Sequence, residues 1–267
     1  METSLPACAP LRGISAIPAF KDNYIWLLQR GNRALVVDPG DAAPVQALLA
    51  REGLRLEAIL LTHHHADHSG GVAALAGDGV RVLGPAAESI TGVGEPLRGG
   101  ERLEFADLGL QLQVLSVPGH TRGHLAYYGQ WEGAPALFCG DTLFGAGCGR
   151  LFEGTPAQMA HSLGLLAALP PQTAVYCAHE YTAANLDFAL AVEPGNRALA
   201  ERVRKVAAMR QAGQATVPLC LAEELATNPF LRCGEAEVRA SAERQAGQAL
   251  ADEVAVFAAL REWKNHF

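Results

Sequence analysis

The chain has 267 residues, enough for one large domain or for a main domain with a smaller partner, and 49% of them are hydrophobic while 18% are charged. This balance is typical of a folded globular protein and excludes an intrinsically disordered one. The net charge of −7, without a basic stripe, excludes non-specific binding to nucleic acid. No apolar run approaches twenty residues, so the sequence predicts no membrane-spanning helix.

The cellular compartment is predicted from the N-terminus and from the cysteines. Residues Met1 to Pro10 lack the charged start and the long apolar core of a signal peptide. The six cysteines form no Cys-x-x-Cys pair, and their scatter favours reduced thiols over a disulfide framework. They are Cys8, Cys139, Cys148, Cys177, Cys220 and Cys233. We therefore expect a cytoplasmic protein, and we expect it to be a monomer.

Up to residue 179 the pattern predicts short strands that alternate with helices. The expected strands are residues 14–17, 24–28, 34–37, 58–61, 80–83, 101–105, 110–117, 125–128, 136–139 and 175–177. The expected helices are residues 41–52, 71–75 and 155–168. Asp41 is a suitable N-cap for the first helix, and Thr155 followed by Pro156 is a typical start for the third. The alternation predicts an α/β domain.

The six residues from His63 to His68 contain four of the nine histidines of the chain. Imidazole and carboxylate groups are the ligands that zinc, iron and manganese take where no thiolate is present. Because the preceding strand leaves the chain extended, His63 and His65 point to one side and His64 to the other. Asp67 and His68 follow one turn later. The cluster predicts part of a metal site, but it has too few positions to complete two metal shells.

Further candidate ligands follow other predicted strands. His120, Asp141 and His179 each come within a few residues of a strand end, where α/β architectures gather their functional groups. The full set is too large for one tetrahedral metal ion and suits two ions if one carboxylate bridges them. The set comprises His63, His65, Asp67, His68, His120, Asp141 and His179.

From about residue 182 the composition shifts to Ala, Glu, Arg, Leu and Gln, and the strand signals fade. The expected helices cover residues 183–192, 197–212 and 248–263, with interruptions at 218–221 and 228–230. We therefore predict two domains, an α/β domain over residues 1–181 and a helical domain over residues 182–267.

The ordered ligand set resembles the metallo-β-lactamase superfamily, and the whole chain resembles its glyoxalase II branch, the hydroxyacylglutathione hydrolases. The histidine motif is specific to the superfamily only. Three elements narrow the resemblance to the branch: Gly147-Cys-Gly-Arg150, Cys177-Ala-His-Glu-Tyr-Thr182 and Arg261-Glu-Trp-Lys264. The other matching segments are Thr62-His-His-His-Ala-Asp-His68, Pro118-Gly-His-Thr-Arg-Gly-His124, Cys139-Gly-Asp-Thr-Leu-Phe144 and Asn228-Pro-Phe-Leu-Arg232.

The resemblance implies an αββα metallo-β-lactamase-like sandwich with an appended C-terminal helical domain that binds substrate and closes its groove. It implies that one metal ion is held by His63, His65 and His120, that the other is held by Asp67, His68 and His179, and that Asp141 bridges them. It gives no ligand role to His64, His124 or His161. Instead, His64 points away from the metals and His124 is a structural hydrogen-bonding residue.

Recognition of glutathione requires local cations, because this tripeptide is anionic and the chain carries a net charge of −7. The resemblance implies contacts from Arg150, Tyr181, Arg261 and Lys264 to the glutathione moiety. Without that match, Arg261 and Lys264 would be interpreted as a solvated helix face. At two positions the sequence departs from the family pattern, since eukaryotic relatives tend to carry Lys at the place of Arg150 and Tyr at that of Phe152. Phe152 cannot donate a hydroxyl hydrogen bond.

The predicted reaction is hydrolysis of S-(R)-lactoylglutathione, and of similar 2-hydroxyacyl glutathiones, to glutathione and D-lactate, the second step of methylglyoxal detoxification. A hydroxide bridging two divalent ions attacks the thioester carbonyl, and one ion stabilises the oxyanion. The thiolate leaves without a strong general acid, because the pKa of a thiol is only about 8.5. Asp67 is a candidate for orienting the nucleophile. We expect zinc at the two sites, with iron and manganese as alternatives.

The main alternative is a mononuclear iron dioxygenase that acts on glutathione persulfide, which has a related fold and a subset of these ligands. The ligands Asp67, His68 and His179 and the long helical tail argue against it. A di-iron electron-transfer protein would need an attached flavin domain. A β-lactamase fits neither a cytoplasmic chain nor a bridging Asp141. A structural metal site would have a closed shell of four ligands.

Overall fold

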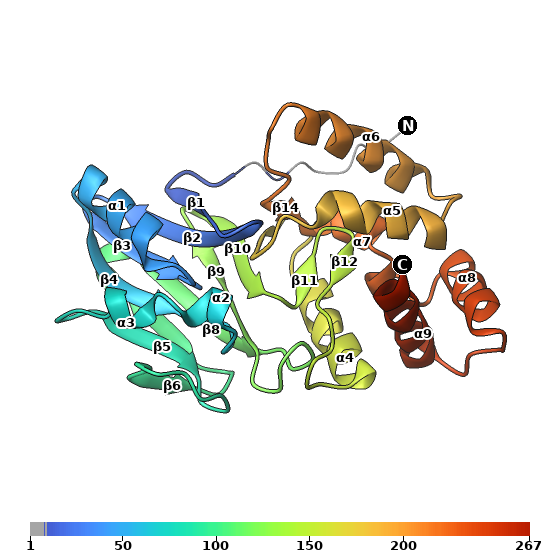
Figure 1. The fold of residues 1–267 in the computed structure, drawn as a ribbon, viewed down its shortest axis with the longest axis horizontal. Helices are drawn as coiled ribbons and strands as arrows, with labels where there is room; N and C mark the ends of the chain where they lie inside the picture. Colours follow the sequence, from blue (N-terminus) through green and yellow to red (C-terminus); the bar gives the residue numbers. More distant parts are fainter. Residues whose placement is uncertain (1–7, 9) are drawn as a thin grey trace.

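The structure, a computed structural model, describes residue 8 and residues 10–267, in which two six-stranded sheets face each other (Figure 1). Most of the segment used to judge a signal peptide lies outside the described residues. The first sheet consists of β1 (Ile14–Ala19), β2 (Asn23–Arg30), β3 (Arg33–Val37), β4 (Arg55–Leu60), β5 (Arg81–Pro85) and β6 (Glu95–Leu97), in this order. The second has the order β14 (Leu219–Cys220), β13 (Ala174–Cys177), β10 (Ala134–Gly140), β9 (Leu125–Trp131), β8 (Leu110–Ser116) and β7 (Arg102–Phe105).

Side-chain alternation along the first sheet separates two apolar layers. In β3, Leu35 and Val37 belong to the large core between the sheets, whereas Ala34 and Val36 belong to a second cluster on the other face. Helix α1 (Ala42–Glu52) contributes Val45 to that second cluster, and α3 (Val72–Leu75) contributes two further side chains. A strand with both faces buried is a continuous apolar run, as residues Ala34 to Val37 are.

Helix α4 (Pro156–Ala167) covers the second sheet, so the layers run helix, sheet, sheet, helix, as predicted. Its start also agrees with the prediction, because Thr155 and Gln158 form a reciprocal capping box. Met159, Leu163 and Leu166 point from α4 into the large core. The sandwich therefore has one continuous apolar interior.

The C-terminal part is more helical than its sequence pattern predicts. The described residues from 182 onward contain five α-helices instead of three: α5 (Thr182–Val192), α6 (Arg197–Gln211), α7 (Leu221–Thr227), α8 (Ala236–Ala246) and α9 (Glu253–His266). The prediction missed α8 because it buries mainly small or polar residues beside Val238, which gives a weak apolar stripe. The expected helix start at residue 248 is wrong, since Asp252 caps α9 and Gly247 ends α8.

The expectation that all cysteines are reduced is wrong for one pair. Cys8 and Cys220 form a disulfide, with Cα atoms 5.1 Å apart. Cys220 lies in β14, which pairs with β13, and a separation of 212 residues between the two cysteines gives no signal in the sequence. The other cysteines of the chain (Cys139, Cys148, Cys177 and Cys233) are free and buried.

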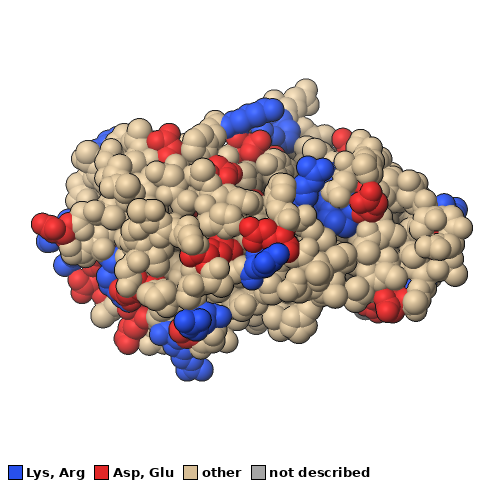
Figure 2. All heavy atoms as spheres, turned by 60° about the horizontal axis from the view of Figure 1, so that its bottom comes forward, with Lys and Arg blue, Asp and Glu red and all other residues tan. Residues whose placement is uncertain are grey.

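Two global predictions can be compared with the structure. Among the described residues, no helix combines the length and apolar character needed to cross a membrane. On the face shown in Figure 2, basic and acidic side chains are interspersed. This mixture agrees with the sequence, in which no basic stripe was found.

Candidate metal centre

All seven predicted ligands lie beyond the ends of four strands, one from the first sheet and three from the second. His63 and His65 follow β4, and the chain then enters the short helix α2 (Ala66–Ser69), which carries Asp67 and His68. The other three ligands, His120, Asp141 and His179, follow β8, β10 and β13. The two sheets therefore bring together residues that are up to 116 positions apart (63 to 179).

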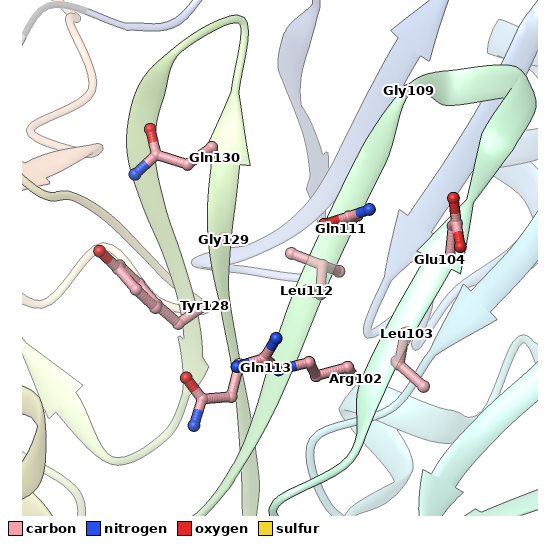
Figure 3. A pocket seen from close by; sticks show the side chains of 10 residues that line it. All are labelled: Arg102, Leu103, Glu104, Gly109, Gln111, Leu112, Gln113, Tyr128, Gly129 and Gln130. Carbon is pink, nitrogen blue, oxygen red and sulfur yellow. The ribbon is translucent and has the colours of Figure 1, made fainter.

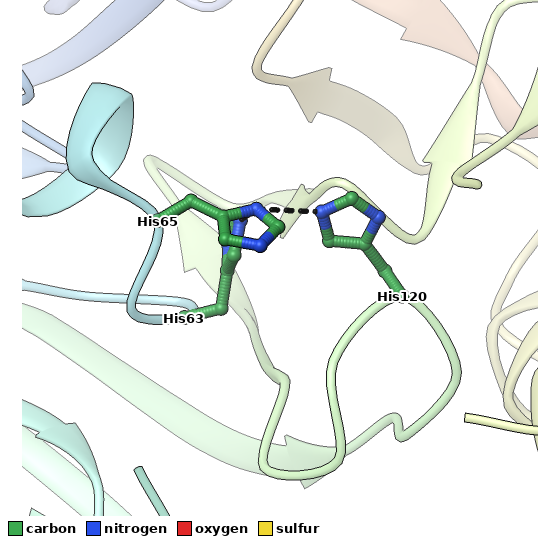
Figure 4. A group of neighbouring side chains, drawn as sticks. All are labelled: His63, His65 and His120. Carbon is green, nitrogen blue, oxygen red and sulfur yellow. Dashed lines mark hydrogen bonds between the residues drawn. The ribbon is translucent and has the colours of Figure 1, made fainter. Parts of the chain in front are cut away.

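The first group consists of His63, His65 and His120, whose rings converge in Figure 4. Nδ1 of His65 lies 3.0 Å from Nε2 of His63 and 3.0 Å from Nε2 of His120. His63 and His120 are buried, and His65 is partly exposed. We call these three residues the histidine group.

The second group consists of Asp67, His68 and His179, which we call the mixed group. Oδ2 of Asp67 lies 3.5 Å from Nε2 of His68 and 3.6 Å from Nε2 of His179. Asp141 lies between the groups: its Oδ1 is 3.4 Å from His68 and 3.3 Å from His179, and its Oδ2 is 3.4 Å from His120. One carboxylate thus presents a different oxygen to each group.

Two observations show that these donors fit metal ions. Nε2 of His68 and Oδ1 of Asp141 are buried and have no hydrogen-bond partner among the described residues, which is costly unless a cation binds them. The donor separations of 3.0 to 3.6 Å are also suitable. Ligands of a tetrahedral ion with bonds of 2.0–2.1 Å lie about 3.3 Å apart.

The histidine group is adapted to bind a cation at neutral pH. Burial lowers the pKa of His63, and the neighbouring His68 adds to the effect. Burial also lowers the pKa values of His65 and His120. These imidazoles are therefore neutral at pH 7, which is the form that binds metal.

The mixed group differs because carboxylates surround its histidines. Burial would lower the pKa of His68, but Asp141 and Asp38 outweigh it and raise the pKa to about 9. Burial likewise opposes the rise in the pKa of His179, which Asp141 and Asp22 cause. Burial would raise the pKa of Asp141, but His68 and His179 hold it well below its usual range. A divalent cation that binds this group displaces protons.

Three ligand rings are oriented by a partner on their outer nitrogen. Such partners fix the rotation of the ring and direct the other nitrogen inward. The pairs are His68 with Asp38 (3.0 Å), His179 with Asp22 (2.9 Å) and His120 with the carbonyl of Arg150 (2.8 Å). Sequence reasoning alone misses Asp22 and Asp38. Asp38 directly follows β3, and a carboxylate at a strand end is the same signal that singled out Asp141.

The histidines without a predicted ligand role lie outside both groups. Nδ1 of His64 faces Glu88, and His161 is exposed on α4. His124 is buried, and its Nε2 accepts the backbone N–H of Asp141 at 3.1 Å. These positions agree with the prediction for His64 and with a structural hydrogen-bonding role for His124.

Of the predicted substrate contacts, Tyr181 and Arg150 border the metal centre. The ring of Tyr181 stacks on that of His179, with centroids 4.7 Å apart and 5° between the planes. Arg150 is exposed and follows β12 (Gly147–Cys148), which pairs with β11 (Leu143–Phe144). Phe152 is 60% exposed, and its ring lies edge-on to His65 and His120.

Arg261 and Lys264 lie on α9, and Arg261 contacts the β11–β12 hairpin. Arg261 is buried, its Nη1 donates to the carbonyl of Cys148 at 3.0 Å, and its Nε has no partner among the described residues. Lys264 is partly exposed, and Nζ donates to the carbonyl of Ala184 at 3.3 Å. Burial, with Arg261 nearby, lowers the pKa of Lys264 to about 8. Arg261 therefore touches the loop that carries Arg150.

A separate cavity of about 550 Å³ opens on the outer face of β7, β8 and β9 (Figure 3). The side chains at its wall include Arg102, Glu104, Tyr128 and several glutamines. It holds none of the predicted site residues, and its polar lining is typical of a solvated sheet face. The predicted site residues therefore lie apart from this cavity.

The sandwich and its histidine and carboxylate donors define a metal-binding protein of the metallo-β-lactamase superfamily, whose family model matches residues 20–179. The model described as hydroxyacylglutathione hydrolase C-terminus matches residues 180–267. A hydroxyacylglutathione hydrolase of Dechloromonas aromatica is 61% identical over 95% of this chain and 99% of its own length. The chain belongs to the hydroxyacylglutathione hydrolase family.

Solved structures share the fold at lower similarity. The BLEG-1 B3 metallo-β-lactamase has a TM-score of 0.60 and 24% identity over 82% of this chain and 99% of its own. The structure of TTHA1623 in a di-iron-bound form has a TM-score of 0.50 and 34% identity over 59% of this chain and 87% of its own. The first of these supports the fold alone.

Proposed function

We propose that the chain hydrolyses hydroxyacylglutathione thioesters, with S-(R)-lactoylglutathione as its substrate and glutathione and D-lactate as products. The observation that carries the proposal is the position of Asp141, which turns one oxygen to His120 and the other to His68 and His179. This is the arrangement that two metal ions with a shared carboxylate require. Full-length relatives named hydroxyacylglutathione hydrolase support the substrate class.

The histidine group would hold one divalent ion, the mixed group would hold the other, and Asp141 would contact both. When bound, two such ions supply a nucleophilic hydroxide at neutral pH and a Lewis acid for the thioester carbonyl. We propose zinc, because its usual ligands are these side chains, with iron and manganese as alternatives. The di-iron form of TTHA1623 keeps iron among the candidates.

Residues of the chain have three further tasks in this proposal. Asp67 accepts a hydrogen bond from Asn23 at 2.9 Å and has a side chain that is 41% exposed, so it can orient an incoming nucleophile. Tyr181 and Phe152 cover the ligand rings and narrow the access of water. The thiolate needs no dedicated acid, because the pKa of a thiol is about 8.5.

We propose that residues 182–267 form the substrate-binding domain, with the boundary after Tyr181. Lys264 and Arg150 supply positive charge for the carboxylates of glutathione, and Tyr181 supplies a hydroxyl group. Arg261 donates to the carbonyl of Cys148 and would add positive charge to the same region. We also propose that the protein is a cytoplasmic monomer, which size-exclusion chromatography and cell fractionation test.

The decisive experiment measures thioester hydrolysis and metal content on one purified sample. We expect two divalent ions per chain and hydrolysis of S-(R)-lactoylglutathione that chelators abolish and added metal restores. Full activity in a sample without metal would contradict the proposal. Oxygen consumption with glutathione persulfide, without thioester hydrolysis, would instead support the dioxygenase alternative.

A further inference from the structure

Glu88 is a buried carboxylate close to the metal centre that the proposed reaction does not use. It lies in the loop after β5, and its side chain is only 3% exposed. A carboxylate at this depth is stable only if several donors satisfy it. Its donors come from the two loops that carry the histidine group.

One oxygen of Glu88 contacts the loop after β4, and the other contacts the loop after β8. Oε2 lies 2.9 Å from Nδ1 of His64, the residue between two predicted ligands. Oε1 accepts the hydroxyl of Thr121, which follows His120, and the backbone N–H of Gly123 at 3.0 Å. The packing is close, because a Cβ at Gly123 would lie 2.5 Å from Cγ of Glu88.

These contacts join the two loops near their tips. At the base, the backbone N–H of Leu125 donates to the carbonyl of Thr62 at 2.9 Å. Farther from the sheets, these loops carry His65 and His120, and Nδ1 of His65 lies 3.0 Å from Nε2 of His120. The histidine group can bind one ion only if the two nitrogens stay this close. Glu88 bridges the chain neighbours of both ligands, so it is placed to hold this distance.

We propose that Glu88 and His64 form a positioning pair that holds the His63–His65 turn against the His120 loop and thereby sets the metal affinity of the histidine group. The pair touches none of the donors of the mixed group, which takes its outer partners from Asp22 and Asp38. Its effect is therefore confined to one of the two groups. The inference rests on the proposed metal centre.

The test measures the affinity of the apo chain for Zn²⁺ by competition with a chromophoric chelator. His179→Ala leaves the histidine group complete, and His120→Ala leaves the mixed group complete. Adding Glu88→Ala to the first background should weaken Zn²⁺ binding about 10-fold, the lower end of the effect of removing a partner that orients a ligand. In the second background Glu88→Ala should leave the affinity unchanged. Equal losses in both backgrounds, or none in either, would overturn the proposal.

Substitutions at His64 separate positioning from general destabilisation. In the His179→Ala background, His64→Asn keeps a donor near the position of Nδ1 and should retain the affinity, whereas His64→Leu should lose it about 10-fold. If the two residues act as a pair, the variant that carries both Glu88→Ala and His64→Leu should bind Zn²⁺ no more weakly than the variant with either change alone. Additive losses would contradict the pairing. Glu88→Gln, which preserves shape and one acceptor, should recover part of the affinity.

Glu193→Ala is the matched control, because Glu193 is also a buried carboxylate but binds Arg232 in the helical part. It should lower the melting temperature without changing Zn²⁺ affinity. A loss of Zn²⁺ affinity equal to that caused by Glu88→Ala would show that Glu88 acts only through the stability of the fold. The metal readout also separates this inference from the proposed function. A chain that binds two Zn²⁺ ions as described but does not cleave the thioester refutes the function and leaves the positioning pair intact.

Discussion

The metal centre and the set of predicted glutathione contacts are built in different ways. Most of the metal donors are buried at strand ends, and several of their rings are held by a second hydrogen bond. Of the predicted contacts, only Arg261 is buried. Arg150 and Tyr181 are exposed, and Lys264 lies in between.

We call the predicted glutathione contacts (Arg150, Tyr181, Arg261 and Lys264) the contact side. Its shape depends on the helical part of the chain. The side-chain amide of Asn228 donates to the carbonyls of Phe144 and Gly147, and Arg261 donates to that of Cys148. The β11–β12 hairpin that leads to Arg150 is thus anchored from α9 and from the start of a 3₁₀ turn. We infer that the metal centre determines the chemical step and that the predicted glutathione contacts determine substrate affinity. Variants should therefore separate into effects on kcat and effects on KM.

The largest effect is expected at Asp141, which contacts both metal groups. Asp141→Ala should lower kcat by about 1,000-fold or more, since electrostatic stabilisation of the transition state is lost. Metal analysis of the same sample should show fewer than two ions per chain. Full turnover by this variant would refute the two-metal centre.

A smaller effect on the same side is expected at Asp22, which touches a ligand ring but not the donors. Asp22→Ala should weaken metal binding about 10- to 100-fold, because His179 loses the partner that orients it. Excess metal should restore most of the activity, and KM should stay near its wild-type value. A raised KM with unchanged metal affinity would place Asp22 on the contact side.

On the contact side, Lys264 should control KM in a pH-dependent way. Its pKa is lowered to about 8, so its charge is present below pH 8 and is lost as the pH rises through that value. KM should therefore rise above pH 8, and Lys264→Ala should raise KM about 10-fold at pH 7. Lys264→Arg, whose charge persists, should remove the rise. If Lys264→Ala changed only kcat, the proposed division between the metal centre and the glutathione contacts would be wrong.

The smallest effect is expected at Phe152, whose side chain offers no hydroxyl group to a substrate. The ring is 60% exposed, so a hydroxyl group fits without a clash. Phe152→Tyr adds one possible hydrogen bond to the substrate and should lower KM about threefold. Steady-state kinetics should show an unchanged kcat. An unaltered KM would show that the hydroxyl finds no partner on the substrate.

The strand pattern predicts an α/β domain, the resemblance to a known family implies the sandwich that the structure has, and the residues predicted as ligands lie close together. Strands buried on both faces are continuous apolar runs, and polar residues directly after them stand out, as His63 and Asp141 do. The errors fall where apolar periodicity is weak. Helix α8 buries small residues, and β6 is only three residues long and contains Pro96.

The sequence by itself determined the fold class, the family and the candidate metal ligands, because these depend on local patterns and on motifs in a fixed order. Only the tertiary structure decided which oxygen of Asp141 faces which group, which carboxylates orient the ligand rings, and that His64 meets Glu88. It also showed that Arg261 is buried against Cys148 rather than exposed on a helix face. These are contacts between distant segments, and their partners are fixed by the packing of two sheets and a helical layer rather than by any local pattern.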